Sequence, residues 1–150
     1  MMTMKKSILA IAALALMAWG CSSDDPSGPA GIPEGTDARP TWEVPNFDLY
    51  EQTMSVEVLL QDTLAKYASE QDIIAATINN EVRGVATAQL VDDQWQFSLI
   101  VGSNESGVNV GLSYYCDKLH RIFTTSWTTF DANTAPMGTD GIYKPQFIKK

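Results

Sequence analysis

Hydrophobic and polar residues alternate with a period of two along most of the chain after residue 53, and this pattern constrains the fold more than any other feature. Successive side chains of a β-strand point to opposite faces of a sheet, so the alternation predicts strands that bury one face and expose the other. The buried positions that it predicts are Met54, Val56, Val58 and Leu60; Ile74, Ala76 and Ile78; Trp95, Phe97, Leu99 and Val101; and Val108, Val110, Leu112, Tyr114 and Cys116.

Short turn sequences separate these segments. Asn79-Asn80 tolerates left-handed backbone and predicts a tight hairpin, and Asp92-Asp93 precedes the Trp95 strand. We therefore predict an all-β fold, an antiparallel β-sandwich that is immunoglobulin-like or similar, with about seven strands in a single domain. The segment 62–71 is left open between a helical turn and a loop. The predicted strands are 54–60, 73–78, 82–91, 94–101, 108–116, 119–126 and 142–148.

The first residues have the layout of a secretory signal peptide. Lys5 and Lys6 form a positive n-region, residues 8–19 are apolar, and Gly20 supplies a small residue before a cut. The apolar run is shorter than the roughly 20 residues that a membrane-spanning helix needs. Residues 1–20 are therefore predicted to be a removable leader.

The sequence at the end of this leader, Ala18-Trp19-Gly20-Cys21, resembles the processing site of bacterial lipoproteins. The resemblance implies lipidation of Cys21 and cleavage before it, although the bulky Trp19 leaves ordinary cleavage nearby as an alternative. The residues 22–25, Ser-Ser-Asp-Asp, resemble the export signal of some Gram-negative surface lipoproteins, or else form a solvated acidic tether. The expected location is the outer membrane, lipid-anchored and exposed at the cell surface.

Proline and glycine punctuate the residues that follow, and few of those residues are large and apolar. We expect residues 21–41 to be the lipidated cysteine and a flexible linker, and residues 42–150 to be the β-sandwich domain. The formal charge of −8 makes nucleic acid an unsuitable partner. The chain has 2 cysteines, so lipidation of Cys21 would leave Cys116 without a disulfide partner, and we expect Cys116 to be buried.

Residues 72–86 read DIIAATINNEVRGVA. They resemble a D-x-I-x-A...E-x-R-G-V-A signature of small β-sandwich modules in Gram-negative surface and secreted proteins. The resemblance extends over roughly residues 42–148, with Val82 where the family often has cysteine. It implies the sandwich fold and no catalytic role, because these modules have no established function.

Two residues of this signature have structural and functional interpretations. Arg83 can hydrogen-bond loop carbonyls or pair with Asp72, or its planar fork can bind a carboxylate or sulfate of a ligand. Gly84 predicts a β-bulge or a close approach of two backbones.

The residues that carry catalysis or hold metals are sparse. His120 is the one histidine, and we expect it at the surface. There is no nucleophile-elbow, P-loop or dinucleotide motif. Asp92-Asp93 is better explained as a turn than as an acid/base pair. Oxygen-bearing residues between Asp131 and Asp140 lack the spacing of a calcium loop. We therefore expect no enzyme activity, no cofactor and no metal site.

Aromatic side chains are the remaining candidates for binding. Tyr115 lies on the face opposite Tyr114, and Trp127 follows a strand into a long loop. Exposed aromatics suit the apolar face of a sugar or a protein partner, or they can simply cover the end of the core. The expected function is a non-catalytic binding or adhesion module for extracellular glycan or protein, with Tyr115, Trp127 and Arg83 as candidate ligand contacts. The alternative is a structural or accessory subunit of an envelope assembly, such as a fimbria-like or transport complex.

Overall fold

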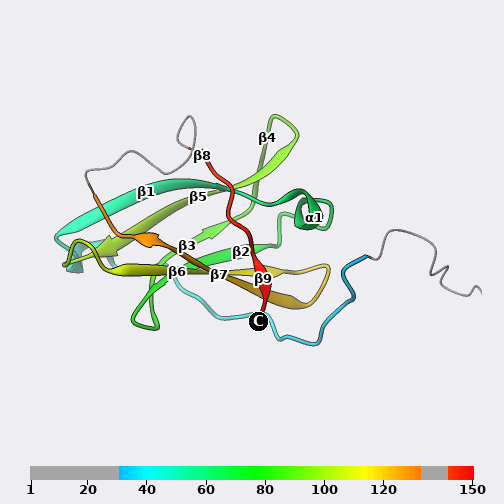
Figure 1. The fold of residues 1–150 in the computed structure, drawn as a ribbon, viewed down its shortest axis with the longest axis horizontal. Coiled ribbons are helices and arrows are strands. Elements are labelled where there is room, and N and C mark those ends of the chain that lie inside the picture. The colour runs from blue at the N-terminus through cyan, green and yellow to red at the C-terminus, as the bar shows by residue number, and fades with distance from the viewer. Residues whose placement is uncertain (1–30, 133–141) are drawn as a thin grey trace, which may run out of the picture. The chain divides into compact units, whose positions relative to one another are not determined.

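The computed structural model describes residues 31–132 and 142–150, and within them strands dominate (Figure 1). The one α-helix of these residues, α1 (Asp62–Ala65), is a single turn, and a 3₁₀ turn, η1 (Phe47–Leu49), precedes the first strand. The strands are β1 (Gln52–Leu59), β2 (Ile73–Ile78), β3 (Glu81–Thr87), β4 (Gln89–Val91), β5 (Gln94–Ser103), β6 (Asn109–Cys116), β7 (Arg121–Thr129), β8 (Ile142–Tyr143) and β9 (Ile148–Lys149).

The strands form two sheets, which confirms the predicted all-β sandwich. One is 4-stranded in the order β4-β5-β1-β8, and the other is 5-stranded in the order β3-β2-β6-β7-β9. Neighbouring strands are antiparallel except for β1 and β8, which pair in parallel. Among the described residues the strands outnumber the predicted set, because two predicted strands are each divided in the structure.

The predicted strand 82–91 is divided at Ala88. Residues before Ala88 belong to the 5-stranded sheet, and residues after it belong to the 4-stranded sheet. Ala88 is 7% exposed, and its N–H donates to the carbonyl oxygen of Asp72 at 3.1 Å. The chain therefore crosses from one layer to the other at a small buried residue, which the continuous hydrophobic pattern does not reveal.

The core lies between the sheets and follows the predicted alternation. Tyr114 is at its centre, with ring centroids of Phe97, Phe123 and Phe147 at 5.8, 6.0 and 5.6 Å. Cys116 is buried in the same cluster, as expected. Trp95 differs from expectation, because it is only partly buried at the edge of the core.

The predictions of tight turns are confirmed, and segment 62–71, which the sequence left between a helical turn and a loop, contains a helical turn. Asn79 and Asn80 have φ of 51° and 66°, and Asp92 and Asp93 have φ of 48° and 61°. Both pairs thus have the left-handed backbone of tight hairpin turns. In the segment 62–71, α1 forms and buries Leu64, which is 1% exposed.

The first described residues differ from the expected linker. The folded unit begins at Ile32, before the boundary expected at residue 42. The N–H groups of Gly35 and Asp37 donate to the carbonyl oxygens of Leu119 and His120 at 2.7 and 2.9 Å. We call residues 32–39 the N-terminal strap. Cys21 and the leader lie outside the described residues, and within the described part no helix is long and apolar enough to span a membrane.

Candidate functional site

Tyr115 was expected to be an exposed aromatic contact, and the structure shows that this is wrong. The residue is 2% exposed. The guanidinium carbon of Arg39, at the end of the strap, lies 5.8 Å from the centroid of the Tyr115 ring. The hydroxyl of Tyr115 is 3.4 Å from Nδ1 of His120, which is itself exposed as expected. The strap covers the outer face of the sheet here, so the Tyr115 ring cannot stack on a ligand.

Other candidates lie outside what the structure describes. Trp127 belongs to β7, but its side chain is not among the described ones. Most of the segment considered as a calcium loop, from residue 133 to residue 140, also lies outside the described residues. In the described ranges no group of three or more His, Cys, Asp and Glu residues could hold a metal ion.

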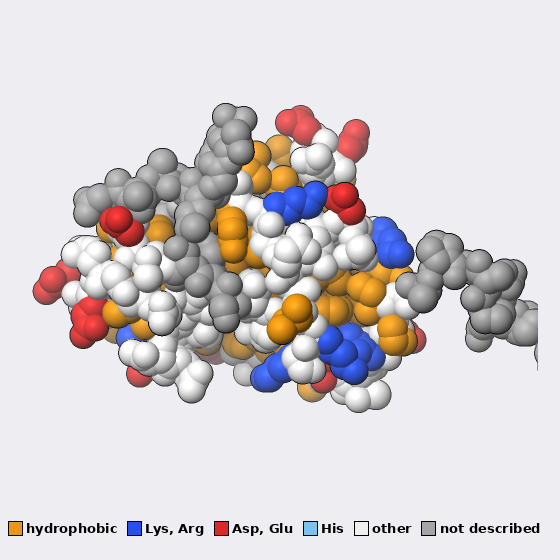
Figure 2. Space-filling model, in the orientation of Figure 1, with side chains coloured by type: hydrophobic (Ala, Val, Ile, Leu, Met, Phe, Trp, Pro, Cys, Tyr) orange, Lys and Arg blue, Asp and Glu red, His pale blue; other side chains and the backbone are white. Residues whose placement is uncertain are grey.

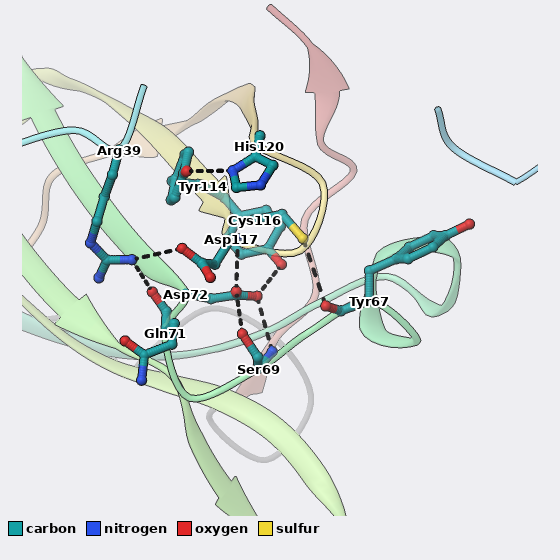
Figure 3. A network of polar contacts seen from close by, with 10 residues as sticks. Arg39, Tyr67, Ser69, Gln71, Asp72, Tyr114, Cys116, Asp117 and His120 are labelled. Carbon is teal, nitrogen blue, oxygen red and sulfur yellow. Dashed lines mark hydrogen bonds and ion pairs between the residues drawn. The ribbon is translucent and has the colours of Figure 1, made fainter. Parts of the chain in front are cut away.

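A buried polar network surrounds Asp72, where β2 begins (Figure 3). Asp72 is 0% exposed. Its carboxylate accepts hydrogen bonds from the Tyr114 hydroxyl at 2.5 Å, the Asp117 N–H at 3.0 Å, and the Ser69 hydroxyl and N–H at 3.0 and 3.3 Å. The network thus joins the loop after α1 to strand β6 and to the turn that follows it.

Burial raises the pKa values of Asp72, Tyr114 and Cys116 in this part of the core. Burial raises the pKa of Asp72 even though its hydrogen bonds oppose that shift. Burial and the neighbouring Asp72 charge raise the pKa of Tyr114 far above its usual range, and burial also raises the pKa of Cys116. The Cys116 thiol therefore stays protonated, and a protonated thiol is a poor nucleophile. The network joins segments of the fold and offers no activated nucleophile.

Arg83 does not pair with Asp72, which was one of its two structural interpretations. Between β2 and β3 the register places Gly84 opposite Ala76 and Val82 opposite Thr77, so Arg83 is the extra residue of a β-bulge. A Cβ at position 84 would overlap the carbonyl oxygen of Ile100 in β5. Both expectations for Gly84, a bulge and a close backbone approach, are confirmed, and the bulge changes the direction of the Arg83 side chain.

The Arg83 side chain lies in a polar pocket. Its Nη2 donates to Oε2 of Glu81 at 2.8 Å, and its guanidinium carbon is 5.0 Å from the centroid of the Tyr50 ring. Its Nε is buried without a hydrogen-bond partner among the described residues. We call the adjoining space of about 150 Å³ the Arg83 pocket, which is lined mainly by Asn79, Arg83, Ser103, Asn104, Glu105 and Val108.

A second pocket lies near the other end of the β1–β5 pair. It has a volume of about 130 Å³, and we call it the Trp95 pocket. Sequence reasoning missed it because the alternation placed Trp95 in the core. The available signal was its position near the start of a strand, two residues after the Asp92-Asp93 turn. The lining residues are Leu59, Leu60, Asp62, Ala65, Asp93, Gln94, Trp95 and Lys144.

No family model, no curated protein and no solved structure matches the chain. The function therefore has to be inferred from the geometry and charge of these pockets.

Proposed function

We propose that this protein is a non-catalytic surface lipoprotein, anchored through Cys21, that binds an acidic extracellular glycan in the Arg83 pocket. The observation that carries the proposal is the Arg83 side chain. It is 17% exposed, it lines a pocket, and its Nε has no hydrogen-bond partner among the described residues. A buried donor without a partner costs about 1–3 kcal/mol. A ligand oxygen on Nε would recover that free energy.

The chemistry of Arg83 favours a carboxylate or sulfate. A guanidinium presents parallel N–H groups to two oxygens of one anionic group, which a lysine ammonium cannot do. Contact with the Tyr50 ring leaves the edge of the guanidinium, where its donors lie, free for in-plane hydrogen bonds. Asn79, at the β2–β3 turn, adds an amide to the same pocket.

Glu81 now occupies one donor of the fork, and it is well suited to being displaced. Its side chain is 71% exposed, so water can replace Arg83 as the partner of the Glu81 carboxylate. A ligand anion that bonds both Nε and Nη2 gains a second, less exposed hydrogen bond.

The formal charge of −8 opposes anions at long range, and Figure 2 shows acidic and basic side chains interspersed on one face. Anion recognition therefore depends on local geometry.

The Arg83 pocket and the first residue of the folded unit lie at opposite ends of the β1–β5 pair. Ser103, which lines the pocket, pairs with Gln52 at one end of the β1–β5 register. Ile32 begins the folded unit at the other end, where its N–H donates to the Tyr67 hydroxyl at 3.1 Å (Figure 1). A lipid on Cys21 would be attached through residues 22–31, whose extended length is at most roughly 35 Å.

The proposal is tested by probing the mature full chain on an array of uronate-containing, sialylated, sulfated and neutral glycans. Arg83→Lys keeps the charge but loses the fork, so it should weaken binding at least about tenfold, or about 1.4 kcal/mol. Glu81→Gln removes the internal competitor and should strengthen binding. Lys149→Gln, at an exposed position on β9, is the charge control and should change little. The proposal fails if no acidic glycan binds, or if the two pocket variants behave like this control.

One observation favours the alternative of a subunit in an envelope assembly. Among the described strands, β4 pairs only with β5, and it is exposed along its length, with Leu90 56% and Val91 40% exposed. Such an edge can accept a strand from another protein. Crosslinking on intact cells through a photoreactive residue at position 91 tests this, and recovery of uncrosslinked monomer only would count against it.

A further inference from the structure

The Trp95 pocket has a chemistry different from that of the Arg83 pocket. We propose that it is a second ligand site, which takes a neutral sugar ring such as the terminal hexopyranose of an oligosaccharide. This inference does not rest on the proposed acidic-glycan site, because the two pockets share no lining residue and differ in charge.

The walls of the pocket supply the two surfaces that a sugar ring needs. Trp95 contributes an indole that is partly packed against the core, so its orientation is held by buried neighbours. Leu59 and Ala65 add apolar surface from the end of β1 and from α1. A pyranose has C–H groups on its faces and hydroxyls around its rim, and it suits an aromatic wall with polar groups beside it.

The polar groups stand at the rim. Asp93 comes from the β4–β5 turn and Gln94 begins β5, and the φ of 61° at Asp93 belongs to the tight hairpin geometry that sets its position. Carboxylates accept hydrogen bonds from sugar hydroxyls, and amides both donate and accept. On the other side, Nζ of Lys144 lies 2.6 Å from Oδ1 of Asp62, with side-chain exposures of 46% and 93%. Both of these groups can therefore reorient toward a ligand.

The charge of the pocket selects against acidic sugars. Asp62 and Asp93 carry two negative charges against the single positive charge of Lys144, which is already paired. A uronate or sulfate here would meet a net negative charge among the lining residues. The volume of about 130 Å³ is of the order of one sugar ring, so we expect a single terminal residue to enter.

The experiment is a titration of the mature full chain with maltose, cellobiose, lactose and N-acetylglucosamine oligomers. Binding is followed by tryptophan fluorescence and by saturation-transfer NMR. We expect at least one of these neutral saccharides to bind with a Kd below about 10 mM and to receive saturation at its terminal ring protons. Trp95→Ala should weaken that binding at least tenfold.

Because Trp95 contacts the core, its removal can perturb folding, and a second pair of variants keeps the test decisive. Asp93→Asn tolerates the left-handed backbone of the turn and should weaken binding several-fold. Asp92→Asn, in the same turn but not lining the pocket, should leave binding unchanged. Absence of binding to every saccharide of the panel would overturn the proposal, and so would equal effects of the two aspartate variants. Arg83→Lys should not change this binding, which separates the two sites.

Discussion

Replacing Asp72 with alanine tests the structural role assigned to the buried network. The carboxylate accepts four hydrogen bonds, and two of its donors, the buried Tyr114 hydroxyl and the partly buried Asp117 N–H, would lose their partner. Tyr114 is 0% exposed, so water cannot readily replace the lost acceptor. Each buried donor left unsatisfied costs about 1–3 kcal/mol.

Two such donors would lower the free energy of unfolding by about 2–6 kcal/mol. The substitution also removes the buried charge of Asp72, which makes the loss smaller. Burial raises the pKa of Asp72, which means that the ionised carboxylate is partly undercompensated in the folded state. We therefore expect Asp72→Ala to lower the free energy of unfolding by about 2–4 kcal/mol, out of the typical total of about 5–15 kcal/mol.

The measurement is urea denaturation at pH 7, followed by tryptophan fluorescence and far-UV circular dichroism, with the m-value compared between variants. Asp62→Asn is the control, because Asp62 is 93% exposed and its loss should change stability by less than about 1 kcal/mol. If Asp72→Ala lost less than about 1 kcal/mol with an unchanged m-value, the assignment of the network as a structural junction would be refuted.

The Asp72 carboxyl group should also make the stability of the folded protein depend on pH, and the sign of this dependence can be predicted. Its folded-state pKa lies above the ordinary value of 3.8, so between those two values the folded protein binds more protons at this site than the unfolded chain. Stability contributed by Asp72 should therefore rise as the pH falls through the folded pKa toward 3.8. Asp72→Asn should remove this component, and the difference between the two stability profiles isolates it from the other carboxylates.

Three further outcomes are expected. Gly84→Ala should destabilise the protein by about 3 kcal/mol in thermal melting, because the added Cβ would meet the Ile100 backbone. Gly111→Ala is the control. Its Cβ would be 3.2 Å from the Thr77 hydroxyl, and it should change stability by less than about 1 kcal/mol. In a Cys21→Ser variant, Cys116 should resist iodoacetamide until urea unfolds the chain, since the thiol is 0% exposed and its pKa is raised; rapid labelling of the native protein would contradict this. Intact-mass measurement on membrane-extracted protein should show acyl chains on Cys21, and a chain cleaved elsewhere without lipid would exclude the anchor.

The candidate sites show how local and long-range information differ. The sequence singled out Arg83, and its interaction with Glu81 joins residues only two apart in the chain. The lining of its pocket by Ser103 and Asn104, far along the chain, could not be predicted from neighbours in sequence. Trp95 was placed in the core because alternation cannot show where a strand leaves the protein interior.

The sequence by itself determined most of the strands and the tight turns, because both depend largely on interactions within a few residues. Alternation sets which face of a strand a side chain occupies, and Asn79-Asn80 and Asp92-Asp93 adopt left-handed backbone locally. Only the tertiary structure decided what covers each face. Tyr115 is buried because the strap, from far earlier in the chain, bonds to Leu119 and His120 and brings Arg39 over its ring. The pattern around Tyr115 is the same whether that face is covered or open, so its burial depends on long-range contacts that the pattern does not encode.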